Sequence, residues 1–215
     1  MPINYSAMPI YRMVHINNVE YVLRNGICIR GHHLADPDYI NIGDTELIAQ
    51  RVDSPVRIVP PGGNLGDYVP FYFAGHTPML YNIKTGWRGI TQRPQSDIVF
   101  LVSSVGEIVQ NCPYWCFTDG HAKHNISRFY NNIAYMINLD WVTIHQQYWN
   151  NTLEDMDRQR RKAAEFLVKD YVPNTCIRII YVFNEACKQR IEALVNQLAL
   201  NISVNIDINK NLYFP

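Results

Sequence analysis

Two charged residues of this sequence, Glu165 and Arg51, are the strongest candidates for chemistry. Glu165 stands alone between a basic segment, residues 158–162, and an apolar run, residues 166–168. A carboxylate fixed at the start of a strand can stabilise positive charge that develops in a transition state. Arg51 follows an expected helix at residues 44–50, and its guanidinium can hold a phosphate or stabilise developing negative charge. Together they suit a reaction that needs an oriented acid and a cation rather than a nucleophile.

Both residues also have an ordinary structural explanation. Glu165 could be an exposed residue of an edge strand. Arg51 could be a helix C-terminal cation, which stabilises the helix dipole by about 0.3–1 kcal/mol. Two common catalytic motifs do not occur in the sequence. The glycines within residues 62–66 are not followed by Lys-Ser/Thr, and there is no Gly-x-Ser-x-Gly elbow.

A second candidate site lies where an apolar strand, residues 68–74, runs into a polar turn. The turn and the residues after it carry His76, Thr77 and Met79. Binding groups are often found on such turns, because the strand holds them rigidly. We therefore expect these three side chains to frame a ligand.

One cluster has the residue types of a zinc site but not the spacing. Cys112 and Cys116 are separated by three residues and are followed by His121 and His124. Structural zinc sites more often use Cys-x2-Cys and His-x3-His pairs. The aromatic residues between the two cysteines favour a buried strand, so we expect core thiols and no metal.

The composition is that of one globular domain, residues 1–215. Of the 215 residues 47% are hydrophobic and 18% are charged, and 19 basic residues balance 19 acidic ones. Zero net charge argues against a protein that coats nucleic acid, since such binding needs many phosphate contacts. It leaves room for a local basic groove. The sequence has no apolar run of 18 residues and no charged-then-apolar leader, so we expect a cytoplasmic protein without a membrane segment.

The periodicity predicts a mixed α/β (α+β) fold. A long irregular loop, residues 52–67, and an aromatic-rich, weakly helical region, residues 118–149, interrupt the regular elements. Expected strands are residues 10–16, 68–74, 97–103, 114–117, 165–171, 177–183 and 203–208; expected helices are residues 19–24, 44–50, 104–110, 153–164 and 185–200, with a short helical turn at 79–83.

Six short segments, taken in order, resemble the DarT family of DNA ADP-ribosyltransferase toxins, in particular its thymidine-modifying branch. The segments are His15, Arg51, residues 69–73 with 78–81, residues 118–122, residues 148–149 and residues 164–168. The resemblance spans about residues 9–172. The family has a basic residue followed by Ser where this chain has Gly75-His76-Thr77, and Gln where it has Ala163. Both differences from the family lie next to expected DNA contacts. They therefore concern which bases around the target are preferred, and not which reaction is catalysed.

The resemblance implies an ADP-ribosyltransferase-like fold of mixed central β-sheets flanked by helices. It implies an enzyme that splits NAD, its substrate, and passes ADP-ribose to a thymine ring nitrogen of single-stranded DNA, without a metal. Glu165 would be catalytic, and Arg51 would be catalytic and would also bind NAD. Either could take the acceptor proton; because arginine side chains stay protonated, Glu165 is the more natural base.

The same resemblance assigns binding residues. His15, Ile16 and Asn17 would hold the adenosine side of NAD, although His15 could equally be a satisfied core histidine. The expected DNA contacts are His76, Thr77, Met79, His121, Tyr148, Trp149, Arg158, Arg160, Arg161 and Lys162, with Tyr130 as a further stacking residue. The basic residues follow Glu154, Asp155 and Asp157, an order that a solvated helix also favours.

As a toxin, the protein would have a cognate macrodomain antitoxin that removes the modification. Two alternatives remain open from sequence. One is a transferase of the same fold that modifies protein or RNA, and the other is a nucleic-acid-binding module without catalytic activity.

Overall fold

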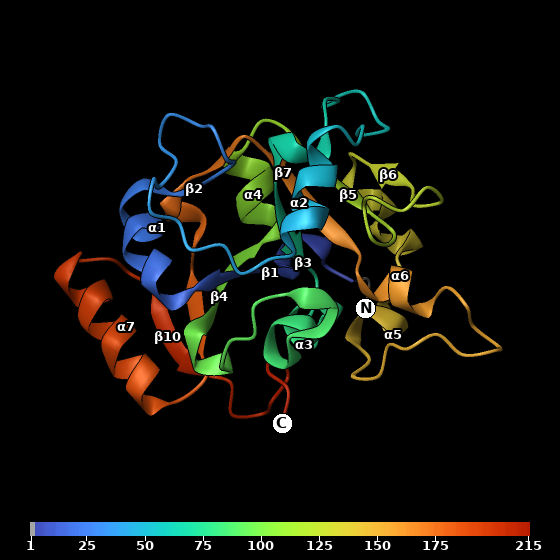
Figure 1. The fold of residues 1–215 in the computed structure, drawn as a ribbon. Helices are drawn as coiled ribbons and strands as arrows, with labels where there is room; N and C mark the ends of the chain where they lie inside the picture. The colour runs from blue at the N-terminus through green and yellow to red at the C-terminus, as the bar shows by residue number, and fades with distance from the viewer. Residues whose placement is uncertain (1–2) are drawn as a thin grey trace.

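The computed structural model describes residues 3–215, which form an eight-stranded sheet and a small two-stranded one (Figure 1). The strands of the large sheet are β1 (Pro9–His15), β3 (Tyr68–Tyr72), β4 (Ile98–Ser104), β5 (Trp115–Thr118), β6 (Phe129–Tyr130), β7 (Glu165–Lys169), β9 (Ile179–Val182) and β10 (Ser203–Ile206). The small sheet pairs β2 (Ile27–Cys28) with β8 (Tyr171–Val172). The α-helices are α1 (Val19–Asn25), α2 (Thr45–Val52), α3 (Pro78–Thr85), α4 (Val105–Asn111), α5 (Trp141–His145), α6 (Arg158–Lys162) and α7 (Glu185–Gln197).

The large sheet consists of two halves that are joined at one point. Its order is β10-β9-β4-β1-β3-β7-β5-β6. Strand β1 pairs with β4 along its whole length, and β3 pairs with β7 over five residues. Between the halves, β1 and β3 share only the pair Tyr11↔Tyr72. Elsewhere along the described residues of β1 and β3, the two halves are not joined by backbone pairing.

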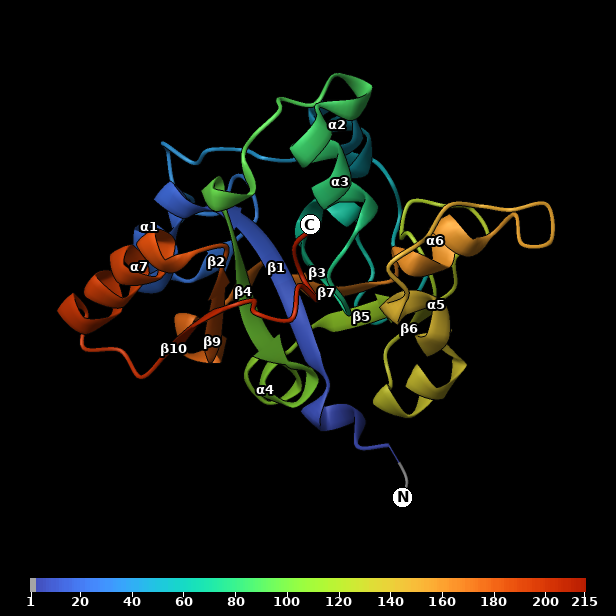
Figure 2. The same ribbon diagram turned by 90° about the horizontal axis from the view of Figure 1, so that it is seen from below.

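The central strands are apolar because both of their faces are covered. In β4 the first six residues are buried, and the first four residues of β7 are buried as well. Figure 2 shows α2 and α3 on one side of the sheet and α4 on the other. Helix α7 flanks the edge formed by β9 and β10, whereas α5 and α6 lie near the edge formed by β5 and β6. In residues 3–215 we find no helix with the length and apolar character of a membrane span.

Side-chain caps fix the start of α2 and α3. Asp44 accepts a hydrogen bond from the backbone N–H of Leu47 at the start of α2. Thr77 does the same for Leu80 at the start of α3, where Pro78 occupies the first helical position. The C-terminal segment returns to α3, where Lys84 Nζ donates to the Pro215 carbonyl oxygen at 2.5 Å.

The mixed α/β fold with a large sheet flanked by helices confirms the fold class expected from sequence. The main difference is the expected helix at residues 153–164. It is helical only over α6, because Thr152 and Asp155 exchange backbone hydrogen bonds in a tight turn before it. The aromatic-rich region is a mixture of β6, a 3-10 segment (Ile133–Asn138) and α5.

Candidate active site

Glu165, the first residue of β7, is buried in the large sheet, where it pairs with Tyr72 of β3. Its side chain is 1% exposed, and both carboxylate oxygens are engaged. Oε2 accepts from Arg51 Nη1 at 2.9 Å, and Oε1 accepts from the backbone N–H of Ala122 at 2.9 Å. The carboxylate is thus held by a cation from α2 and by an amide from the loop after β5. It is not the exposed edge-strand residue that was the alternative from sequence.

A tight turn after β5 brings that amide to Glu165. The hydroxyl of Thr118, at the end of β5, accepts from the backbone N–H of Glu165 at 3.2 Å and donates to the Gly120 carbonyl oxygen at 2.6 Å. The backbone of Gly120 passes so close to Arg160 that a side chain at this position would collide with the guanidinium. Only glycine therefore fits here without a shift, and the loop can place Ala122 against the carboxylate.

The surroundings keep Glu165 ionised although it is buried. Burial acts to raise the pKa of this carboxyl, but Arg51, His121 and the Ala122 amide together hold the pKa below its ordinary value. For His121 the balance is different. Burial, with a smaller contribution from Arg51, lowers the pKa of His121 against the opposing effect of Glu165.

One nitrogen of the Arg51 guanidinium is buried without a partner in the described part of the chain. While Nη1 pairs with Glu165, Nη2 is buried and has no hydrogen-bond partner among residues 3–215. Leaving a buried guanidinium nitrogen without an acceptor is costly, so this nitrogen is suited to bind an acceptor from outside the described chain. The alternative of a mere helix C-terminal cation does not account for this contact with β7.

Two residues beside this pair were not anticipated from sequence. Tyr72 lies opposite Glu165 in the register of β3 and β7, and burial, with Glu165 nearby, raises the pKa of Tyr72 to about 12. Its hydroxyl lies 3.4 Å from Met79 Sδ. Arg12 of β1 reaches toward β3, where its Nη1 donates to the Pro70 carbonyl oxygen at 3.1 Å. Tyr72 is placed beside Glu165 by the register of β3 and β7, and the sequence alone does not reveal that register.

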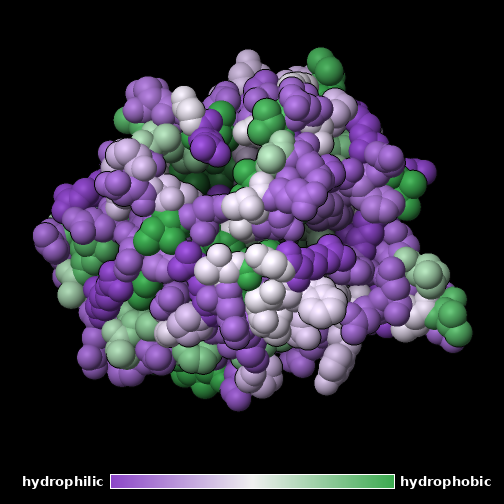
Figure 3. Space-filling model, viewed as in Figure 1, coloured by the Kyte–Doolittle hydropathy of each residue, from purple (hydrophilic) through white to green (hydrophobic). Residues whose placement is uncertain are grey.

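His15 lies away from the Arg51–Glu165 pair, at the end of β1. From Tyr11, the residue level with Tyr72 and Glu165, four residues along the strand correspond to about 13 Å. His15 Nδ1 accepts from the backbone N–H of Asn17 at 3.2 Å, and burial lowers the pKa of the His15 ring. Ile16 is buried and Asn17 is exposed. Figure 3 shows a largely hydrophilic face that is hollowed between α1 and α2, with apolar residues on the floor of the hollow.

The profile of the family described as "ssDNA thymidine ADP-ribosyltransferase, DarT" matches residues 11–214. The chain belongs to the DarT family. It is 34% identical to a DNA ADP-ribosyl transferase of Escherichia coli over 196 residues, which cover 91% of this chain and 89% of the relative. It also resembles two structures of Thermus sp. 2.9 DarT at 31% identity. One is the complex with ADP-ribosylated ssDNA (TM-score 0.85; 97% of this chain and 99% of that chain), and the other is the complex with NAD+ (TM-score 0.81; 94% and 96%).

Within this DarT-family fold, the predicted DNA-contact residues fall into three groups. The first group, Met79 and His121, lies beside the Arg51–Glu165 pair, as the contacts of Tyr72 and the charges around His121 indicate. The second, Tyr148 and Trp149, lies on the surface. Tyr148 is 85% exposed, and Trp149 packs edge-on against Tyr81 with ring centroids 5.8 Å apart.

The third group serves the fold, which corrects the expectation from sequence. His76 is 4% exposed, and its Nε2 lies 2.7 Å from the Tyr213 carbonyl oxygen. Thr77 is 1% exposed and caps α3. Both side chains face the interior because the C-terminal segment covers the turn, so neither is available to frame a base.

Most of the basic residues of α6 also form ion pairs or hydrogen bonds within the protein. Arg160 pairs with Asp119 and Asp157 at 2.9 and 2.7 Å. Arg161 Nε and Nη2 lie 2.9 and 2.6 Å from carboxylates of Asp140 and Asp155. Lys162 is 3% exposed and donates to the carbonyl oxygens of Ile144 and Gln146. Only Arg158 has a loose contact, 3.5 Å from Asp155. The acidic residues that neutralise this cluster come partly from distant segments.

The cysteine and histidine cluster considered from sequence does not gather around one point. Cys112 and Cys116 are buried, and burial raises the pKa of the Cys116 thiol to about 12. No group of three metal-ligating side chains occurs in the part of the chain that the structure describes.

Proposed function

We propose that this protein is an enzyme that transfers ADP-ribose from NAD to thymidine in single-stranded DNA. Membership of the DarT family supports this reaction. The single observation that carries it is the buried, ionised Glu165, whose two oxygens are oriented by Arg51 and Ala122. Such a fixed charge in a site shielded from water costs little reorganisation when charge develops on a substrate.

NAD supplies the ADP-ribosyl group, and the chemistry breaks the bond between the ribose C1′ and the nicotinamide nitrogen. Positive charge then develops on the sugar, and nicotinamide leaves with the electron pair of the broken bond. A thymine ring nitrogen forms the new bond to C1′ and loses its proton. In our proposal Glu165 stabilises the positively charged sugar more than the neutral ground state, which is the requirement for lowering the barrier.

Arg51 stabilises negative charge on the substrates of the same reaction. Its Nη1 is committed to Glu165, whereas the buried Nη2 is free to donate to an anionic substrate group. The orphaned nitrogen therefore fits a phosphate of NAD or the thymine oxygens as the ring loses its proton. Glu165 is our proposed proton acceptor, because it is ionised and arginine has no free base form at neutral pH.

The adenosine side of NAD would lie along β1. Since His15 Nδ1 accepts from Asn17, the ring proton belongs on Nε2, which can donate to a sugar hydroxyl. Ile16 and Asn17 supply backbone groups at the same strand end. The estimated distance of about 13 Å between this end and the level of Glu165 suits an extended dinucleotide.

The acceptor base would approach on the side of Met79 and His121. A thymine ring nitrogen is hidden in a base pair, so the target must be single-stranded or extruded. Tyr148, Trp149 and Arg158 are exposed or partly exposed on this part of the molecule, and we propose them as contacts for the strand.

We further propose that the protein is the toxin of a toxin–antitoxin pair that acts in the cytoplasm, and that a macrodomain protein removes its modification. These proposals rest on the resemblance to DarT toxins and on the DNA substrate.

Mass spectrometry of oligonucleotides tests the proposed function. Single-stranded oligonucleotides with and without one thymidine are incubated with NAD and the protein. We expect a gain of one ADP-ribose on the thymidine-containing strand alone. In a second experiment, labelled NAD is incubated with the protein and a mixture of DNA, RNA and protein acceptors. Label on RNA or protein but not on DNA would contradict the proposal.

A further inference from the structure

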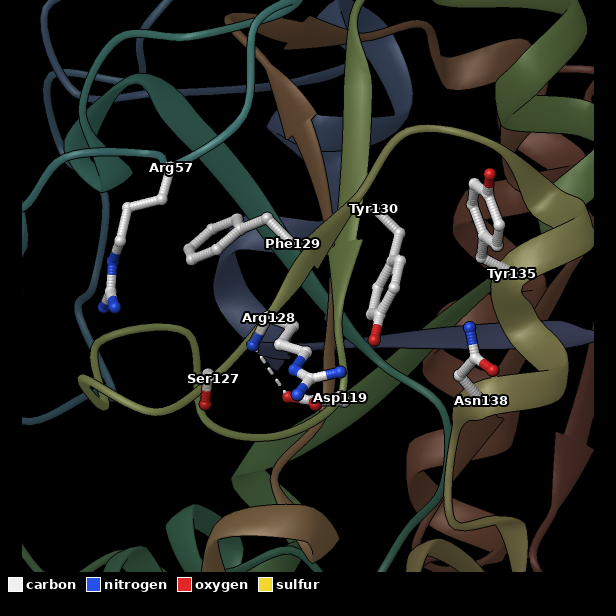
Figure 4. Close-up of a pocket in the computed structure, with 8 residues that line it drawn as sticks. All are labelled: Arg57, Asp119, Ser127, Arg128, Phe129, Tyr130, Tyr135 and Asn138. Carbon is white, nitrogen blue, oxygen red and sulfur yellow. Dashed lines mark hydrogen bonds between the residues drawn. The ribbon is translucent and has the colours of Figure 1, made fainter.

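A hollow beside the edge strand β6 has the features of a second nucleotide-binding site. It is a cavity of about 680 Å3, within the range of about 300–1,000 Å3 common for small-ligand pockets. Figure 4 shows Arg57 and Phe129 on one side and Tyr130, Tyr135 and Asn138 on the other. None of these residues belongs to the Arg51–Glu165 site.

The cations that line this hollow have little compensation from acids. The Arg57 guanidinium donates to the backbone carbonyl oxygens of His124 and Asn125, which are neutral acceptors. Arg128 is exposed, and its guanidinium forms no ion pair with any residue that the structure describes. The one acid of the lining, Asp119, is neutralised by Arg160 at 2.9 Å. A protein of zero net charge therefore carries a local excess of positive charge here.

Aromatic rings stand beside those cations. Tyr135 is 52% exposed, and its ring centroid lies 5.9 Å from that of Tyr130 at an interplanar angle of 40°. Arg57 lies over the Phe129 ring, 5.7 Å from its centroid. Exposed rings next to unpaired cations are the combination that binds single-stranded nucleic acid, because bases stack on the rings and phosphates pair with the cations.

A second cavity lies next to this hollow and shares Arg57 with it. It measures about 390 Å3. Ala122, Lys123 and His124 line the second cavity, and Ala122 is the residue whose amide holds Glu165. The loop of residues 119–130 therefore contributes to both cavities and also to the contact with Glu165.

We propose that the hollow at β6, lined by Arg57, Arg128, Tyr130 and Tyr135, binds a nucleotide of the single strand that flanks the modified thymidine. The two arginines would pair with phosphates, and Tyr135 would stack on a base. This inference rests on the proposed function, because it extends the path of the same DNA substrate. The proposed site contacts a nucleotide next to the target thymidine. This contact does not depend on which base that nucleotide carries.

The first test measures binding of a fluorescent ten-nucleotide single strand with one central thymidine at several salt concentrations. The variant is Arg57→Gln/Arg128→Gln, and the matched control is Arg24→Gln/Arg178→Gln, which removes two exposed arginines elsewhere. We expect the variant to bind roughly tenfold more weakly and its log–log salt slope to fall by about 1.4, since each phosphate contact contributes about 0.7. An affinity and slope equal to those of the control would overturn the proposal.

The second test examines stacking, and it does not depend on the arginines. Tyr135→Ala is expected to weaken binding by about fivefold to a hundredfold, whereas Tyr135→Phe keeps the ring and the affinity. Placing one abasic nucleotide at successive positions should identify a single flanking position that weakens binding to wild type but not to Tyr135→Ala. Equal loss in both proteins at every position would contradict the stacking role. Tighter binding of the same sequence as RNA would contradict the assignment to DNA.

These outcomes separate the inference from the proposed function. If wild type adds no ADP-ribose to any thymidine-containing strand, the proposed function fails. If wild type modifies the ten-nucleotide strand but the double arginine variant has the same KM for it, only the flanking site fails.

Discussion

Arg51 and Glu165, 114 residues apart in the chain, form a buried ion pair with an Nη1–Oε2 distance of 2.9 Å. One partner lies in the last turn of α2 and the other begins a central strand of the sheet. The pair therefore ties the end of α2 to the start of β7. It also leaves Arg51 Nη2 oriented within the site and without a partner among residues 3–215.

Glu165→Gln is expected to abolish most of the activity while leaving DNA binding intact. An amide of the same shape cannot stabilise a positively charged sugar, so we expect the turnover number to fall by about a hundredfold or more. Initial rates of ADP-ribosylation and fluorescence anisotropy with a thymidine-containing strand provide the two readouts. Glu192→Gln on α7 is the matched control. Unchanged turnover would remove Glu165 from the mechanism, and unchanged binding with lost turnover excludes a module that only binds nucleic acid.

Substitutions of Arg51 and Glu165 should have non-additive effects on the free energy of unfolding. Arg51→Met alone or Glu165→Leu alone leaves an uncompensated charge in a buried place, which costs about 3–5 kcal/mol of unfolding free energy. The double variant removes both charges and should lose much less than the sum of the single losses. Urea unfolding of the four proteins measures this coupling. Additive losses would mean that the two side chains do not stabilise each other.

Stability at low pH should depend on the same carboxylate. Burial acts to raise the pKa of Glu165, but Arg51, His121 and the Ala122 amide hold the pKa below its ordinary value. An unfolded Glu, with a pKa of about 4.3, takes up a proton before the folded one does. The stabilising contribution is therefore complete above that value and is lost as the pH falls through the folded pKa. We expect the stability difference between wild type and Glu165→Gln to be constant from pH 7 to 5 and to shrink below pH 4.

The regular elements and the family could be predicted from sequence, because their signals are local. Strand β4 begins with five consecutive apolar residues, and α7 has a regular amphipathic pattern. Six short segments taken in order, including those of Glu165 and Arg51, indicated the DarT family. Their catalytic roles stay predictions, although the structure brings the two side chains together.

Residues whose partners come from distant segments could not be placed from sequence. His76 was expected on a binding turn, but the C-terminal segment covers it and Tyr213 supplies its acceptor. Arg161 was expected to meet DNA, but Asp140 approaches it from the start of α5. In each case the partner is determined by how the chain returns across the sheet, for which the local sequence carries no signal. Tyr72 was missed for the same reason, since only strand register places it beside Glu165.

Lys162 is expected to order the segment that carries Tyr148 and Trp149. Its ammonium is buried and donates to the carbonyl oxygens of Ile144 and Gln146 at 2.7 and 2.8 Å. Lys162→Met keeps most of the apolar stem but leaves both acceptors without this partner, which costs about 1–3 kcal/mol for a buried polar group. Proteolysis at residues 146–152 should therefore become faster, and the unfolding free energy should fall. Lys188→Met on α7, where the ammonium lies near Glu192 on an accessible surface, serves as the control. If both variants were cleaved at the wild-type rate, Lys162 would not hold this segment, and its two short hydrogen bonds would contribute nothing to the order of the proposed strand contacts.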